Sequence, residues 1–172
     1  MRAIGKGSLA SILAVGLHVT RIILWIALGG VAIAMAVIPF VPFLVGAFTG
    51  SDHVDINGDG GIELSDFFEV AYAFVTFAVM LFVVNRLLEI LKTLRFGSPF
   101  VKENADRFRS LGYALLIGEG AKFVFGFLSL VFDADIDINF SVITWLAIIA
   151  VLVLAEVFRE GARMKEEQDL TV

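Results

Sequence analysis

Four long apolar stretches alternate with polar segments along this chain of 172 residues, at about residues 22–48, 67–91, 111–132 and 141–158. Each is long enough to cross a hydrocarbon core of about 30 Å as a helix that rises about 1.5 Å per residue. Apolar residues make up 59% of the sequence, a share typical of membrane proteins. The pattern therefore predicts an all-α fold, an integral membrane four-helix bundle that forms one domain over residues 1–172.

Proline and charge predict how the first and last spans end. Pro39 and Pro42 should kink or end the first helix, because proline lacks a backbone N–H and clashes with the preceding turn. Residues 1–21 form either an interfacial helix or the first turns of this span. A cleaved signal peptide is the rival interpretation, and we reject it because the following apolar run is too long and lacks a small-residue cleavage site. The charged tail, residues 159–172, should begin as a helix.

A tight reversal is expected between the second and third spans. Gly97 fits the position just past a helix end, Ser98 suits an N-cap and Pro99 suits the first helical residue. Helical spacing of apolar residues continues on both sides of this point. We therefore expect a helical hairpin over residues 86–110, whose second helix continues into the third span.

Basic residues are sorted along the chain in a way that predicts its orientation. Apart from Lys122 in the third span and Arg86 near the end of the second, every lysine and arginine lies before the first span, between the second and third, or after the fourth. The loops at 49–66 and 133–140 contain neither residue type. Short loops rich in lysine and arginine stay in the cytoplasm, so the N-terminus, the hairpin and the C-terminus should be cytoplasmic. The outer loop 49–66 and the acidic link 133–137 should face outward.

The outer loop contains a run that resembles an EF-hand calcium loop, Asp55-Ile-Asn-Gly-Asp-Gly-Gly-Ile-Glu-Leu-Ser-Asp66. An EF-hand supplies oxygen ligands from loop positions 1, 3, 5, 7, 9 and 12, with glycine at position 6. Gly60 occupies position 6 here, and the aspartate at position 12 resembles dockerin-type loops rather than the standard glutamate. The predicted Ca²⁺ ligands are Asp55, Asn57, Asp59, the carbonyl of Gly61, Glu63 and Asp66.

The alternative for this loop is an acidic, glycine-rich turn that binds no ion, because aspartate, asparagine and glycine are also the commonest turn residues. We favour the ion site because the template positions are filled in order. Extracellular calcium modules bind at roughly 10⁻⁴–10⁻³ M, and we expect a similar affinity here. Ion binding would neutralise the carboxylates and allow the next helix to begin at Leu64.

Four charged side chains are expected at membrane depth, namely Arg86, Glu119, Lys122 and Glu156. An ionisable group at mid-bilayer costs roughly 2.5–3.5 kcal/mol on insertion scales, so such groups usually face other helices and are paired. A count of helical rises places Arg86 and Glu119 at similar depth, which predicts an ion pair between helices. Lys122 should then bond Glu119, three residues away, or a carbonyl. Glu156 should meet Arg159 or the hairpin.

This intramembrane group has two interpretations. It is either a path for ions or protons, or a structural clamp that sets the helix register. We favour the clamp, because Gly118, Gly120 and Gly126 lie close by and independently predict close helix packing.

Residues that carry enzyme chemistry are scarce. The chain has no cysteine, which excludes disulfides, zinc–thiolate sites and thiol nucleophiles. His18 and His53 are the two histidines, and neither has a serine or carboxylate partner at catalytic spacing. Gly58 and Gly60 lie in an anionic segment that would repel phosphate. We therefore predict that the chain is not an enzyme and does not bind nucleic acid directly.

Two runs in the second half of the chain carry a family resemblance. They are Ser98-Pro-Phe-Val-Lys-Glu-Asn104, followed by Arg107-Phe-Arg-Ser-Leu-Gly112, and the tail from Glu156 to Val172. Both resemble a YoaS-like family of bacterial four-span membrane proteins classed as a domain of unknown function. The resemblance implies a multi-pass protein of the bacterial inner (cytoplasmic) membrane and, as a cytoplasmic partner, a helix-turn-helix regulator. The calcium loop departs from the pattern of this family.

Two functions fit these features. The first is a sensor or accessory protein, in which Ca²⁺ in the outer loop biases the second span. That span would then alter how residues 92–109 contact a cytoplasmic partner or anionic lipid. The second is a cation channel or transporter that uses the face of Glu119 and Lys122, and a subunit this small would need a homo-oligomeric ring. The lipid bilayer is a partner in both.

Overall fold

The computed structural model of the chain describes residues 9–41, 43, 47, 64–96, 99–132, 134, 136 and 139–170. Over these residues the fold is helical. The elements are α1 (Leu9–Val37), the 3₁₀ turn η1 (Ile38–Phe40), α3 (Leu64–Phe96), α4 (Lys102–Phe132) and α5 (Val142–Asp169). The four α-helices are each long and apolar enough to cross a membrane. The predicted all-helical class and the four long apolar helices are therefore confirmed.

The outer helices begin and end largely where the sequence predicts. α1 continues without a break from Leu9 through Arg21, so residues 9–21 are the first turns of the helix that forms the first span. It ends at Val37, directly before η1, which contains Pro39 near its start. α5 begins after the N-cap Ser141, whose side chain accepts a hydrogen bond from the backbone N–H of Thr144. It continues to Asp169, so the charged tail is helical for most of its length.

The hairpin between α3 and α4 differs from the prediction at its second helix. α4 begins at Lys102 rather than at Pro99. The backbone N–H of Asn104 donates to the carbonyl of Val101 at 3.0 Å, and the Asn104 side chain donates to the carbonyl of Pro99 at 2.9 Å. This side chain therefore holds residues 99–101 as a connection outside the helix. Gly97 and the predicted N-cap Ser98 lie outside the described residues.

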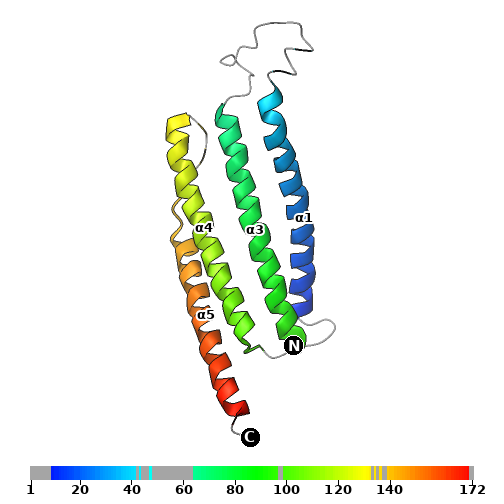
Figure 1. The fold of residues 1–172 in the computed structure, drawn as a ribbon, viewed down its shortest axis with the longest axis vertical. Coiled ribbons are helices and arrows are strands. Elements are labelled where there is room, and N and C mark those ends of the chain that lie inside the picture. Colours follow the sequence, from blue (N-terminus) through cyan, green and yellow to red (C-terminus); the bar gives the residue numbers. More distant parts are fainter. Residues whose placement is uncertain are drawn as a thin grey trace.

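The helices form an open row, in which each packs mainly against its neighbours in the sequence (Figure 1). α1 packs on α3, α3 on α4 and α4 on α5, and no comparable packing joins α1 to α5 within the described ranges. The predicted four-helix bundle is thus a layer of antiparallel helices whose first and last members do not close on each other. Short connections favour this order, because they place consecutive helices side by side.

Two apolar seams hold the row together. Leu24 of α1 packs with Leu81 and Val84 of α3. Ile90 of α3, with Phe108 and Leu111 of α4 and Ala155 of α5, forms the second seam. Many other large apolar side chains on the four helices are exposed in the isolated chain. An exposed apolar surface of this extent marks contact with a membrane or another chain, and it agrees with lipid-facing helices.

α5 is displaced along α4 toward the end of the row where α1 begins. The side-chain amine of Lys122 lies 3.4 Å from the backbone carbonyl of Asn139, so α5 starts beside the middle of α4 rather than beside its end. In Figure 1, α5 begins partway along α4 and extends past the start of α4 at the other end. Ile136 in this connection is buried.

Glycine determines how closely α4 and α5 approach. A Cβ atom on Gly112 would lie 2.4 Å from Cδ2 and 2.8 Å from Cγ of Leu152, which is closer than side chains pack. A Cβ on Gly118 would lie 3.2 Å from Cγ1 of Val79 on α3, so close packing is confirmed there. A Cβ on Gly120 would meet nothing within 4 Å, so the expected packing at this glycine is wrong.

Replacing Gly112 with valine should therefore separate α4 from α5. We expect the variant to lose about 1–3 kcal/mol of unfolding free energy, the usual cost of an overpacked interior. The measurement is unfolding of the detergent-solubilised protein by sodium dodecyl sulfate, followed by tryptophan fluorescence. Gly120→Val is the matched control, because it adds the same side chain to the same helix where there is open space. Equal effects of the two substitutions would contradict the close approach at Gly112.

Candidate functional site

The predicted calcium loop meets the described structure at its last three residues. α3 begins at Leu64, where the sequence predicts the start of the next helix, and Asp66 lies in its first turn. A carboxylate in the first turn is favoured by the helix dipole whether or not an ion is bound. Asp55, Asn57, Asp59, Gly61 and Glu63 lie outside the described residues.

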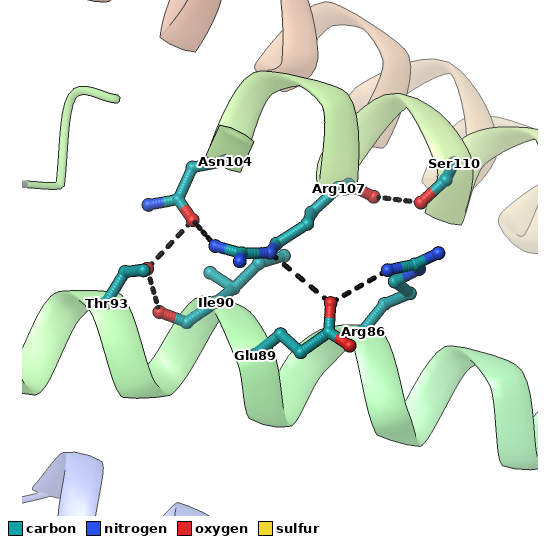
Figure 2. Close-up of polar contacts among 7 residues, drawn as sticks. All are labelled: Arg86, Glu89, Ile90, Thr93, Asn104, Arg107 and Ser110. Carbon is teal, nitrogen blue, oxygen red and sulfur yellow. Dashed lines mark hydrogen bonds and ion pairs between the residues drawn. The ribbon is translucent and has the colours of Figure 1, made fainter. Parts of the chain in front are cut away.

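A polar cluster joins α3 to α4 near the hairpin, and we call Arg86, Glu89, Thr93, Asn104 and Arg107 the α3–α4 polar cluster (Figure 2). Asn104 is at its centre and is completely buried, with 0% of its surface exposed. Its Oδ1 accepts hydrogen bonds from Thr93 Oγ1 at 2.8 Å and from Arg107 Nη1 at 2.9 Å. Its Nδ2 donates to the Pro99 carbonyl. All of its polar atoms thus have partners, as a buried amide requires.

Glu89 connects the two helices through charge. Its Oε2 lies 2.8 Å from Arg86 Nη1 on the same helix and 3.3 Å from Arg107 Nε on α4. One carboxylate therefore faces two guanidinium groups (Figure 2). The pairs are partly exposed, so their Coulomb energy is reduced by solvent. Their main effect is to set the register of α3 against α4, together with the hydrogen bonds of Asn104.

The predicted ion pair between Arg86 and Glu119 is wrong. Arg86 pairs with Glu89, and Glu119 pairs with Lys122. The register explains the difference, because Gly118, next to Glu119, faces Val79 across the helices. Arg86 lies seven residues from Val79, or about 10 Å along the helix axis. Arg86 lies 10 residues before the end of α3 at Phe96, whereas Glu119 lies 17 residues after the start of α4 at Lys102, so the two groups differ in depth by about two helical turns.

The pair of Glu119 and Lys122 has the predicted form. Lys122 Nζ lies 3.0 Å from Glu119 Oε1, and the same amine reaches the Asn139 carbonyl. The Glu119 side chain is 9% exposed and that of Lys122 is 21% exposed. The prediction that Lys122 bonds Glu119 or a backbone carbonyl is confirmed, because its amine reaches both. The pair neutralises two charges in the middle of a helix that is long enough to cross the membrane.

One oxygen of this pair is without a partner. Glu119 Oε2 is buried and accepts no hydrogen bond within the described structure, and the buried Nε1–H of Trp145 on α5 donates none. Glu119 and Trp145 each lie seven residues, about two helical turns, from the contact of Gly112 with Leu152. The register therefore places them at the same level of the α4–α5 interface. A water molecule, a proton or a cation would be stabilised by such an oxygen.

Glu156 lies on the exposed side of α5, where it pairs with Arg159. Both line a hollow between α4 and α5 of about 230 Å³, together with Arg109 and Tyr113. The expectation that Glu156 meets Arg159 is confirmed. Because Glu156 is exposed, its pair does not resemble the buried pair of Glu119.

Asn104 and Thr93 are the polar residues whose role sequence reasoning missed. An asparagine in a charged helical run is usually exposed, so composition alone does not distinguish Asn104 from its neighbours. The available signal is its place at the end of the run that begins with Ser98. The structure links the two ends of that run, because the Asn104 amide donates a hydrogen bond to the carbonyl of Pro99.

Comparison with known families identifies this region of the chain. A family model described as a protein of unknown function, DUF2975, matches residues 67–172, which is more than half of the chain. The chain therefore belongs to the DUF2975 family. The match begins directly after the candidate calcium loop and includes the α3–α4 polar cluster and the pair of Glu119 and Lys122. No curated protein and no solved structure matches the chain.

Proposed function

We propose that this DUF2975 protein is a divalent-ion-responsive sensor or accessory protein of a bacterial inner membrane, of the YoaS-like kind. In this proposal, Ca²⁺ in the outer loop acts through α3 on a cytoplasmic partner. The observation that carries it is the continuity of α3, which extends over 33 residues from Leu64 to Phe96. At about 1.5 Å per residue this helix is roughly 50 Å long. Its first turn holds Asp66, and its last turns hold Glu89 and Thr93.

The far end of α3 is joined to α4 rather than free. Glu89 and Thr93 bind Arg107 and Asn104, so a shift or rotation of α3 would also move the first turns of α4. The exposed residues there include Lys92, Lys102, Glu103 and Asp106. Such a surface suits a protein partner with mixed charge, and a helix-turn-helix regulator is the candidate that the family resemblance suggests. The hairpin and both termini are cytoplasmic in this proposal, as the positive-inside rule favours.

The donor set of the loop fits Ca²⁺, which prefers carboxylate and carbonyl oxygens. Asp55, Asn57, Asp59, Gly61, Glu63 and Asp66 would hold the ion, and because α3 begins at Leu64 the last of these ligands, Asp66, would lie in the first turn of the helix. A bound ion would neutralise acidic groups next to the first turn of α3. It would thereby change the forces on the end of the helix that reaches the hairpin.

Calcium titration of the full chain in detergent tests the loop. The wild-type protein should bind Ca²⁺ at roughly 10⁻⁴–10⁻³ M. Asp55→Ala and Asp59→Ala should each weaken binding at least about tenfold, because each removes a charged ligand. Asp52→Ala is the matched control, since this aspartate lies in the same loop outside the ligand pattern. Equal binding heats in all four proteins would remove the calcium site from the proposal.

The coupling requires a second measurement at the hairpin. The chain has no cysteine, so one cysteine in place of the exposed Lys102 can carry a fluorescent label that reports this position alone. Ca²⁺ should change the signal in the labelled wild-type background and leave it unchanged with Asp59→Ala. Ca²⁺ binding without a change at the hairpin would keep the site and reject the sensor.

An oligomeric cation channel or transporter is the second candidate, and the unpartnered Oε2 of the buried Glu119 favours it. In this second candidate, a moving ion or proton would compete with the Lys122 amine for the Glu119 carboxylate. The described chain is an open row of helices, so a pore would have to form between several copies. Cation flux into liposomes that contain the protein, compared with Glu119→Gln, decides between the two. Flux no greater than in empty vesicles eliminates the channel.

A further inference from the structure

A cavity of about 520 Å³ lies between the first turns of α1 and the last turns of α3. Its size is within the range of small-molecule binding sites. Two small residues on one face of α1, Ala10 and Ala14, keep it open, and Asn85 and Leu88 line it from α3. Nearer the midpoints of the two helices, Leu24 of α1 packs against Leu81 and Val84 of α3 and closes the cavity on that side. The cavity is therefore a pocket at one end of the α1–α3 interface.

The charge of this cavity is positive. Arg21 from α1 and Lys92 from α3 both line it, and neither forms an ion pair in the part of the chain that the structure describes. Glu89 also lines it, but its carboxylate is neutralised by Arg86 and Arg107. The cavity therefore contains two basic side chains, one from each facing helix, and within the described residues neither is paired with a carboxylate.

Uncharged polar groups also line the cavity, beside its two basic side chains. His18 lines the cavity between Ala14 and Arg21, and its Nδ1 donates to the Ala14 carbonyl at 2.7 Å. That bond orients the ring, with Nε2 as its second polar atom. The side chain of Asn85 brings an amide donor from α3. Phosphate oxygens accept hydrogen bonds from all of the donors present, and guanidinium and ammonium groups are the usual phosphate ligands.

The cavity lies at the boundary between charged and apolar sequence. Arg21 is the last charged residue of α1, and an uncharged run begins at Ile22. Trp25 lies one turn beyond Arg21, and Trp25, Ile22 and Ile26 are exposed. Tryptophan near a basic residue is typical of the membrane interface. An apolar surface for acyl chains therefore adjoins the phosphate-binding end of the pocket, which a free phosphate ion would not use.

We propose that this cavity binds the phosphate headgroup of an anionic phospholipid through Arg21 and Lys92. Basic pockets between transmembrane helices on the cytoplasmic side are known sites for such headgroups. The lipid would fill the gap between α1 and α3 and hold their ends together. This site does not depend on the calcium loop, because its residues lie at the opposite end of α3, although Lys92 also belongs to the exposed surface of the hairpin.

Native mass spectrometry of the full chain, released from detergent micelles, tests the site by titration with phosphatidylglycerol. The double variant Arg21→Gln/Lys92→Gln should bind this lipid about tenfold more weakly, from the loss of two basic contacts. Phosphatidylcholine with the same acyl chains should bind weakly to both proteins. The matched control is Arg163→Gln/Lys165→Gln, which removes the same two residue types from the exposed end of α5. It should stay within about twofold of the wild type.

A second variant keeps every charge and removes the space. Ala14→Leu would fill the hollow and should weaken phosphatidylglycerol binding as the charge variant does. The proposal is overturned if the control double variant loses as much affinity, if Ala14→Leu binds normally, or if phosphatidylcholine binds as tightly. Inorganic phosphate that displaces the lipid would assign the pocket to a soluble phosphate compound and would also overturn it.

Discussion

Replacing Asn104 with alanine is expected to lower the free energy of unfolding by about 3 kcal/mol. Asn104 is completely buried, and its side chain meets partners from three places in the hairpin. Without it the Pro99 carbonyl loses its donor, and Thr93 and Arg107 lose a shared acceptor. A buried polar group left without a partner costs about 1–3 kcal/mol, and the cavity left by the side chain adds to this.

Reversible unfolding in mixed micelles, followed by fluorescence of Trp25 and Trp145, measures the change. Thr93→Val removes one hydroxyl from the same cluster and should cost about 1 kcal/mol. Asn139→Ala, at an exposed asparagine, should change stability by less than about 0.5 kcal/mol. A loss for Asn104→Ala no larger than that for Asn139→Ala would show that the α3–α4 polar cluster does not hold the hairpin.

Replacing Lys122 with methionine should cost roughly 3–5 kcal/mol, because it leaves a buried carboxylate without its counter-ion. Glu119 is 9% exposed and its Oε2 already lacks a partner within the described residues, so no neighbour is placed to compensate. The lost bond from Lys122 to the Asn139 carbonyl would also release the connection to α5. The same unfolding measurement applies.

A double variant separates the pair from its parts. Glu119→Leu/Lys122→Met removes both charges and should return to within about 1 kcal/mol of the wild type, because replacing a whole buried pair by apolar groups is often neutral. Arg163→Met is the control for an exposed arginine that pairs with Glu160 and Glu167, and it should cost less than about 1 kcal/mol. Additive losses from Glu119→Leu and Lys122→Met would rule out the clamp.

The sequence alone was enough for the helices and most of their ends. Hydrophobic periodicity is a local property, so four spans could be recognised without knowing how they pack. Pro39 ends α1 for the local reason that its ring and missing N–H disfavour a continued helix. The start of α3 at Leu64 and the bond between Glu119 and Lys122 also depend on residues only a few positions apart.

Contacts between helices could not be predicted in the same way, because they depend on register. The register of α3 against α4 is set by Asn104 and its bonds to Thr93 and Pro99, and in this register Arg86 pairs with Glu89 rather than with Glu119. The displacement of α5 follows from the space that Gly112 leaves for Leu152. The basic cavity exists because Ala10 and Ala14 meet the end of α3.

The amino-acid sequence by itself thus determined that this chain is helical, that four of its segments are long and apolar enough to cross a membrane, and that an acidic, glycine-rich run lies at residues 55–66. The tertiary structure alone decided which charges meet, that the helices form an open row, and where a basic hollow remains between them. The physical reason is one of range. Helix formation and membrane partition depend on neighbouring residues, whereas pairing and cavities depend on how side-chain volumes from distant segments fill a shared space.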